Sequence, residues 1–322
     1  MTVNCARPCD VSTTPSDAPV TPAIIDTDPG IDDALALLLA WGSPELAVEA
    51  LTTVAGNVPL ALATVNAWRV VDLCGPTPSP LIAKGAGAPL RRPLRTAVDY
   101  HGADGLGDVG GWPETPPGLA SADAVDVLLA HAGRHRSRLV LLAIGPLTNL
   151  ALAVARDPSA MRAVGRVIVM GGAVRVPGNV TPEAEFNIHV DPDAARQVLE
   201  AGLSLDLVPL DATRQAVLRR DELAAALARR PGRVAERVAA FTARGFTEHG
   251  RDGLPGLTLH DPLAVAVAVD PTVVTWERLR LTVGGDGETR SATGAPNCRV
   301  ATHVDRDRFV GMFLERLCAN TA

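Results

Sequence analysis

The chain has 322 residues, of which 47% are hydrophobic and 20% charged, so it can bury the core of one large α/β domain or two small ones. The net charge is −6, no basic stripe interrupts it, and aromatic residues make up only 3%, which argues against nucleic acid as the main partner. No apolar run is long enough to span a membrane, so no membrane partner is expected.

The first 20 residues are rich in Thr, Pro and Ser and contain no apolar signal-peptide core. We therefore expect residues 1 to 20 to be a disordered extension of a cytoplasmic protein, and residues 21 to 322 to form a single domain. The cysteines are scattered, odd in number and lack CxxC spacing, which suggests neither a disulfide framework nor a zinc site; they are Cys5, Cys9, Cys74, Cys298 and Cys318.

The first predicted strand ends in an unusually acidic turn. The apolar run from Ala23 to Ile25 is followed by Pro29-Gly30 and then by a helix predicted from Ile31 to Trp41. Four carboxylates fall around this turn, those of Asp26, Asp28, Asp32 and Asp33. One or two could cap the helix, but four would raise one another's pKa values unless a cation is bound. The turn is thus either a site for a hard cation, Ca²⁺ or Mg²⁺, or a capped turn with surface acids.

Strand-like and helix-like segments alternate along the rest of the chain. Strands are predicted at 46–54, 80–83, 138–143, 166–170, 203–209 and 279–283, and helices at 60–73, 146–156, 192–201, 261–269 and 305–319, with two more between 220 and 247. This alternation predicts an α/β fold, an open and mostly parallel sheet with helices on both faces. Two Gly- and acid-rich stretches, 100–112 and 245–258, are predicted to be loops.

Polar residues collect where predicted strands end, and in open α/β sheets ligands bind beyond those ends. Asn57 follows the second strand, Asn179 to Asn187 follows the strand at 166–170, and His260-Asp261 opens a later helix. Asn57 and Asn179 could each be ordinary turn residues, and Asp261 could be an ordinary helix cap. Their convergence on one rim suits a neutral ligand with many hydroxyls, such as a sugar.

These residues resemble the inosine-uridine-preferring nucleoside hydrolase family, whose motifs occur here in the family's order from about residue 23 to 270. The matching segments are Asp26-Thr27-Asp28-Pro29-Gly30-Ile31-Asp32-Asp33-Ala34, Ala55-Gly56-Asn57, His101-Gly102, Gly145-Pro146-Leu147-Thr148-Asn149, Met170-Gly171-Gly172, Gly178-Asn179-Val180-Thr181-Pro182, Ala184-Glu185-Phe186-Asn187 and His260-Asp261-Pro262.

The resemblance implies a Ca²⁺-dependent N-ribohydrolase on an open α/β sheet with a Rossmann-like core. It implies that calcium is held by Asp28, Asp33, the main-chain carbonyl of Ile144, and Asp261. The family often has Thr at the Ile144 position, but a main-chain ligand tolerates the change. It further implies that the ribose is bound by Asp32, Asn57, Met170, Asn179, Glu185 and Asn187.

The resemblance also assigns the chemistry. Asp28 would accept a proton from the attacking water, and His260 would protonate the departing base, because histidine titrates near working pH. His101 is either a second residue near the base or a structural loop histidine. The partner is expected to be a small ribonucleoside, and relatives suggest a homodimer or homotetramer.

Two other readings compete. A Mg²⁺-dependent phosphatase or phosphotransferase would use Asp26-Thr27-Asp28 as its acidic turn, but it also needs a lysine for phosphate, and lysine is scarce. A non-catalytic nucleoside- or sugar-binding protein would not need to retain Asp28 and His260. The sequence leaves the preferred base open; in the 245–258 stretch, Phe246 and His249 are the residues expected to reach it.

Overall fold

The computed structural model describes residues 20–116, 118–251 and 253–319. The predicted disordered extension, with Cys5 and Cys9, lies outside this range except for Val20. Among the described residues, no helix has both the length and the apolar character needed to cross a membrane.

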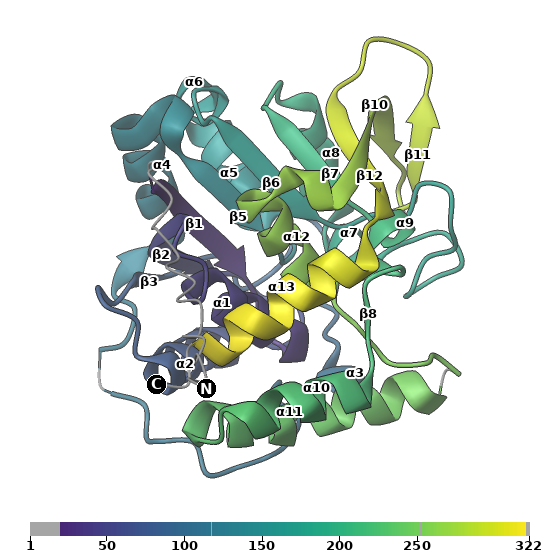
Figure 1. Cartoon of the computed structure of the whole chain (residues 1–322). Helices are drawn as coiled ribbons and strands as arrows, with labels where there is room; N and C mark the ends of the chain where they lie inside the picture. The colour runs from purple at the N-terminus through teal and green to yellow at the C-terminus, as the bar shows by residue number, and fades with distance from the viewer. Residues whose placement is uncertain (1–19, 117, 252, 320–322) are drawn as a thin grey trace, which may run out of the picture.

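The fold is built on a ten-stranded sheet with the order β11-β10-β12-β7-β6-β5-β1-β2-β3-β4 (Figure 1). The strands from β12 to β4 pair in parallel, and β10 and β11 are added antiparallel at one edge. Their bounds are β1 Thr21–Thr27, β2 Leu46–Thr53, β3 Leu81–Lys84, β4 Ala122–Asp123, β5 Val140–Ala143, β6 Arg166–Met170, β7 Leu205–Val208, β10 Val274–Val283, β11 Thr289–Ala292 and β12 Cys298–Val304. A separate two-stranded sheet joins β8 Val217–Leu218 to β9 Leu257–Thr258.

The strand order reverses in the middle of the sheet. From β1 the chain builds outward through β2, β3 and β4, and it then returns to the other side of β1 with β5, β6 and β7. The carboxyl ends of β1 and β5 therefore lie side by side, and the chain leaves them toward opposite edges of the sheet. Such a topological switch point is where open α/β sheets bind ligands.

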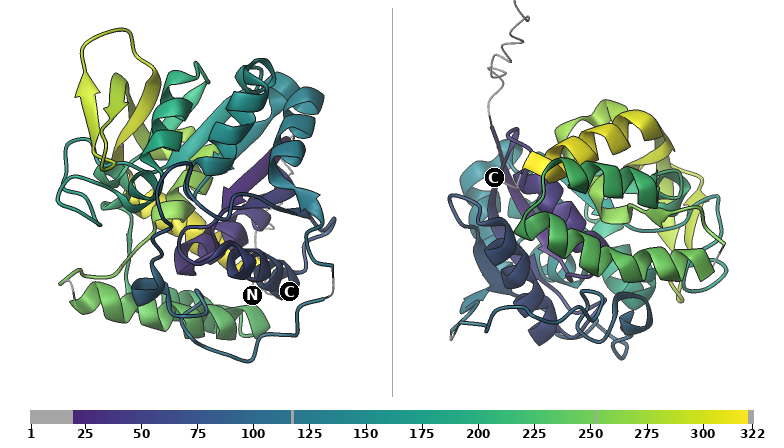
Figure 2. Two further views of the ribbon diagram at one scale, coloured as in Figure 1. Left: turned by 180° about the vertical axis from the view of Figure 1, so that it is seen from behind. Right: turned by 60° about the horizontal axis from the view of Figure 1, so that its bottom comes forward.

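Helices cover both faces of the sheet, as predicted (Figure 2). Alternate residues of the central strands enter different cores: Ala23 and Ile25 of β1 belong to one, and Ile24 belongs to the other. The first face is covered by α1 Ile31–Trp41, α2 Leu60–Cys74, α9 Leu210–Thr213, α10 Arg220–Arg229, α11 Arg233–Arg251, α12 His260–Val269 and α13 Arg306–Ala319. The second is covered by α4 Ala124–His135, α5 Thr148–Arg156, α6 Pro158–Arg162, α7 Phe186–Val190 and α8 Pro192–Glu200. The remaining short helices are α3 Val98–His101, η1 Arg136–Arg138 and η2 Pro271–Val273.

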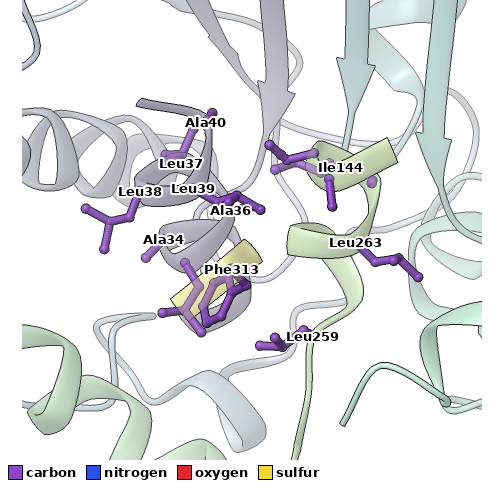
Figure 3. Close-up of a cluster of buried hydrophobic side chains, with 14 of the residues drawn as sticks. Ala34, Ala36, Leu37, Leu38, Leu39, Ala40, Ile144, Leu259, Leu263 and Phe313 are labelled. Carbon is purple, nitrogen blue, oxygen red and sulfur yellow. The ribbon is translucent and has the colours of Figure 1, made fainter. Parts of the chain in front are cut away.

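Helix α1 is the centre of the first core. Its residues from Ala34 to Ala40 are all fully buried, as expected of a helix that is apolar on every side. Figure 3 shows Ala34 and the side chains from Ala36 to Ala40 in one cluster with Leu259 and Leu263 near the start of α12 and with Phe313 of α13. Because α1 is fixed on all sides, the acidic turn at its N-terminus is held rigidly.

Two predictions of secondary structure need correction, and several elements were missed. The stretch 245–258 is not all loop, because α11 continues to Arg251 with its buried residues still spaced at three to four positions, through Phe241, Gly245 and His249. The 100–112 stretch begins inside α3. Helix α4 and strands β4, β11 and β12 were not predicted at all.

Candidate active site

The turn after β1 is organised by the side chain of Asp33. The carboxylate of Asp33 accepts hydrogen bonds from Thr27 Oγ1 at 2.6 Å, from the Gly30 N–H at 3.0 Å and from Asn57 Nδ2 at 2.9 Å. These bonds join the end of β1, the first turn of α1 and the loop after β2. Asp33 therefore fixes both the turn and the side chain of Asn57.

Asp28 lies fully buried between two glycine-containing loops. Its Oδ2 accepts the Asn57 N–H at 2.6 Å, whereas its Oδ1 has no hydrogen-bond partner among the described residues. A Cβ on Gly56 or Gly145 would come within 2.1 Å and 2.5 Å of these oxygens, so only glycine leaves room for the carboxylate. Burial, followed by the negative charge of Asp33, raises the pKa of Asp28 well above its usual range.

A group of carboxylates meets beside Asp28. Oxygens of Asp32, Asp33 and Asp261 all lie within 4.8 Å of one another, because the N-terminus of α12 brings Asp261 against the start of α1. Burial and then the charge of Asp33 raise the pKa of Asp32 to about 7. Burial and then the charge of Asp32 raise the pKa of Asp261 as well. The fourth aspartate of the motif, Asp26, is separate: its Oδ1 accepts from Thr52 Oγ1 at 2.5 Å and from Asn149 Nδ2 at 2.7 Å.

This donor set fits a hard divalent cation. Buried carboxylates that repel one another, and a buried Asp28 oxygen without a described partner, are relieved by a cation bound through oxygen. The carbonyl of Ile144 follows β5 at the same edge of the sheet, where it accepts a hydrogen bond from Asn187 Nδ2 at 3.1 Å. No thiolate or imidazole belongs to the carboxylate group among the described residues, so its chemistry favours calcium or magnesium over zinc.

A cavity of about 630 Å³ opens above these carboxylates, a size usual for small-molecule sites. Ten of the residues predicted from the sequence line it: Asp32, Asn57, His101, Ile144, Met170, Asn179, Glu185, Asn187, His260 and Asp261. Asp28 and Asp33 are fully buried and are not among the lining residues. The structure thus brings the sequence-predicted residues together in one place.

One wall of the cavity is the segment that leads into α7. Glu185 caps this helix, since its carboxylate accepts the N–H groups of Asn187 at 2.9 Å and Ile188 at 3.1 Å, and also that of Gly172 at 2.9 Å. Burial raises the pKa of Glu185. Asn179 Oδ1 accepts the Phe186 N–H at 2.9 Å, which closes the segment on itself. These bonds hold the polar groups in fixed positions around the cavity.

Among the histidines that line the cavity, His260 and His101 have strongly lowered pKa values and are therefore neutral near pH 7. His260 Nδ1 lies 2.8 Å from Thr213 Oγ1 of α9. Burial, then the positive charges of His249 and Arg214, lower the pKa of His260 to about 3. His101 Nδ1 accepts the Ile31 N–H at 3.0 Å, which leaves the ring proton on Nε2. Burial, then the charge of Arg244, lowers the pKa of His101 to about 3.

Several lining residues were not predicted, including Tyr100, Phe186, Arg214 and Leu254. Phe186 lies inside a recognised motif without an assigned role, Tyr100 and Leu254 belong to the two Gly- and acid-rich stretches without one, and Arg214 belongs to a segment with no distinctive polar pattern. His249 lines the cavity, as expected, and lies 2.7 Å from the Tyr100 hydroxyl through Nδ1. Phe246 is not among the lining residues; it is buried with the Arg220 guanidinium 4.7 Å from its ring centroid.

Comparison with known proteins agrees with this geometry. The family model for "Inosine-uridine preferring nucleoside hydrolase" matches residues 23–311. The chain is 36% identical to the inosine-uridine preferring nucleoside hydrolase of Leishmania major, over 91% of this chain and 96% of that protein. It is 34% identical to the pyrimidine-specific ribonucleoside hydrolase RihA of Citrobacter koseri, over 92% of this chain and 97% of that protein. The structure of a purine-preferring ribonucleoside hydrolase from Gardnerella vaginalis superposes with a TM-score of 0.88 at 31% identity, covering 93% of this chain and 99% of that one.

Proposed function

The chain belongs to the inosine-uridine preferring nucleoside hydrolase family, whose members act on N-glycosyl bonds, and we propose that it is a calcium-dependent ribonucleoside hydrolase that releases free base and ribose. The observation that carries the proposal is a cavity with amide and carboxylate walls directly above a buried carboxylate group. A neutral sugar with adjacent hydroxyls is the ligand that such walls can bind, and a hard cation is the charge that the carboxylates need.

The proposed cation ligands are Asp28, Asp33, Asp261 and the carbonyl oxygen of Ile144. Asp32 belongs to the same carboxylate group but also lines the cavity. We therefore assign it to binding of the sugar, at the place where the sugar meets the proposed cation. Calcium, when bound, would attract the 2′- and 3′-hydroxyls and would orient and acidify the attacking water. Alanine in place of Asp33 or Asp261 is expected to abolish activity together with metal binding.

The remaining walls are assigned to the ribose. Asn57, Asn179 and Asn187 offer amide donors and acceptors, and Glu185 offers a carboxylate whose capping bonds hold it still. Met170 contributes an apolar surface beside Asn187, whose Nδ2 lies 3.5 Å from the Met170 sulfur. As the C1′–N bond breaks, positive charge grows on the sugar ring, and the surrounding carboxylates stabilise it.

Asp28 is proposed as the general base and His260 as the acid for the leaving base. Asp28 suits a base because its Oδ1 has no hydrogen-bond partner among the described residues and can accept a proton from the attacking water. His260 lines the cavity beside Asp261, and Thr213 holds its ring at Nδ1. Because His260 rests neutral, it needs a proton that comes from water, directly or relayed through His101, as the base departs. His101 is proposed to contact the base through Nε2.

The competing functions are less consistent with the cavity. A phosphatase or phosphotransferase would have to bind a phosphate among several carboxylates, and Arg214 is the only arginine or lysine among the described lining residues. A non-catalytic binding protein would gain nothing from a buried, proton-accepting Asp28 next to the sugar site. The cytoplasmic location, the homodimeric or homotetrameric state and the single-domain organisation remain predictions.

The proposal is tested with a panel of purine and pyrimidine nucleosides, by measuring free base and free ribose in equal amounts with and without a calcium chelator. We expect ribose release from at least one ribonucleoside and its loss on chelation. Release of phosphate from sugar phosphates instead would favour the phosphatase, and tight binding without turnover would favour the binding protein.

A further inference from the structure

Arg214 lies on the cavity wall, and none of the roles above uses it. It follows the last residue of α9, with its N–H bonded to the Leu210 carbonyl at 3.2 Å. Its Nη2 donates to the Gly178 carbonyl at 2.8 Å, which holds the guanidinium beside the segment that leads into α7. Arg214 is exposed, and no salt bridge to it is found among the described residues. A guanidinium has five N–H donors, and the Gly178 contact uses one of them.

The position of Arg214 gives the cavity two electrically different ends. Asp28, Asp32, Asp33 and Asp261 form the deep end, next to the proposed cation and sugar. Arg214 is the sequence neighbour of Thr213, whose hydroxyl lies 2.8 Å from His260 Nδ1, and both Arg214 and His260 line the cavity. The guanidinium is therefore on the side of the histidine assigned to the leaving base. Leu210, which belongs to the same short helix as Thr213, also lines the cavity and gives that side an apolar surface suited to a base.

We propose that Arg214 stabilises the negative charge that develops on the departing base, by donating hydrogen bonds to a base carbonyl oxygen. This inference rests on the proposed hydrolysis of nucleosides. When the C1′–N bond breaks, its electron pair goes to the base, where it is shared with the carbonyl oxygens of a uracil or hypoxanthine. Water supplies the hydroxyl group to C1′ and a proton to Asp28, and the base finally gains a proton from His260 or from solvent.

The role differs from that of an acid. Arginine keeps its charge throughout, so Arg214 stabilises the leaving group without giving up a proton. The interaction strengthens as the base becomes anionic and is weak with the neutral nucleoside, so it should act on kcat more than on KM. Preorganised donors of this kind change rates by roughly 10²- to 10³-fold when one is removed.

The test compares three ribosides: uridine, 5-fluorouridine, whose base is a better leaving group, and p-nitrophenyl riboside, whose phenolate departs without help and has no base carbonyl. In Arg214→Gln, we expect kcat to fall about 10²-fold on uridine, less on 5-fluorouridine and under about 3-fold on p-nitrophenyl riboside. Arg214→Lys keeps the charge and should recover much of the loss. The matched control is Arg175→Gln, because the Arg175 guanidinium pairs with Glu277 at 2.7 Å and does not line the cavity.

The outcomes are distinct. An equal fall of kcat on all three substrates would mean that Arg214 only supports the Gly178 segment, and an unchanged kcat on uridine would mean that it does not meet the base; either result overturns the inference. A loss confined to uridine 5′-monophosphate would assign Arg214 to a phosphate and overturn it too. If the wild type cleaves p-nitrophenyl riboside and nucleosides normally, any of these results leaves the proposed function intact. A wild type inert on every riboside would refute the proposed function itself.

Discussion

Alanine in place of Gly145 is expected to displace the Asp28 carboxylate. The added Cβ would lie 2.5 Å from Asp28 Oδ1, about 0.9 Å closer than the 3.4 Å at which ordinary contact begins. The carboxylate cannot easily retreat, since Oδ2 is bonded to the Asn57 N–H at 2.6 Å and Gly56 closes the other side. Gly145 has no left-handed φ, so the methyl group acts on Asp28 and does not strain the backbone.

A shift of about 1 Å is large for both roles of Asp28. Metal–ligand distances tolerate only about 0.2 Å, and misplacing a catalytic group by 1 Å costs roughly 10²-fold in rate. Gly145→Ala should therefore lower kcat at least about 10²-fold and weaken calcium binding by roughly 10- to 100-fold. Calcium titration calorimetry and nucleoside turnover measure the two effects separately.

Gly133→Ala is the matched control. A Cβ there meets nothing within 4 Å, and Gly133 lies within α4, so the methyl should leave kcat unchanged and stabilise the fold by about 0.4–1 kcal/mol. If Gly145→Ala kept the calcium affinity and turnover of the wild type, Asp28 could not be held where the structure has it, and its roles as ligand and base would be lost.

Three further predictions concern the sugar, the leaving group and the fold. Asn187→Ala should reduce kcat more than thermal stability, and ribonucleosides should be cleaved much faster than 2′-deoxyribonucleosides; equal rates on both sugars would argue against recognition of the 2′-hydroxyl. His260→Ala should lower kcat by roughly 10²- to 10⁴-fold on inosine or uridine but little on p-nitrophenyl riboside, with calcium content unchanged, and an equal fall on both would end its role as an acid. Glu45 accepts two bonds from Arg316 at 2.7 Å, which lower the pKa of Glu45, so its contribution is present above its ordinary pKa of 4.5 and is lost as the pH falls. Glu45→Gln should therefore cost about 1 kcal/mol in urea unfolding at pH 7 and much less at pH 3; an equal cost at both values would contradict this reading.

Much of the fold was predictable because the central strands are continuous apolar runs. The segments at β5 and β6 lie between turn residues and are buried on both faces, so composition alone identifies them. Helix α4 was missed although the sequence contains a signal for its start. Asp123 caps the helix by accepting hydrogen bonds from the N–H groups of Val125 and Asp126. Strand β12 was harder, because neither of its partners in the sheet follows it directly in the sequence: it pairs antiparallel with β10, across β11, and in parallel with the distant β7. Such pairing leaves no local pattern.

Some residues of the site were likewise identifiable from the sequence, and others were not. Asp28, Asp33 and Asn57 were identifiable because they cluster at strand ends in polar motifs that have no simpler explanation together. Tyr100 and Arg214 were not identifiable, because each is an ordinary residue of a short helix or its end that the fold brings to the cavity from far along the chain. The tautomer of His101 was also beyond the sequence, since it depends on the Ile31 N–H, 70 positions away.

The most direct test of the account is calcium reconstitution of the metal-free enzyme. The protein is stripped with a chelator and titrated with Ca²⁺ while ribose release from its preferred nucleoside is followed. We expect no turnover without metal and full turnover at one Ca²⁺ per chain, whereas Asp261→Ala should stay inactive at every Ca²⁺ concentration. Full turnover by the stripped enzyme, or restoration by Zn²⁺ and not by Ca²⁺, would contradict the central claim that the buried carboxylates at the β1 and α12 ends hold a catalytic calcium ion.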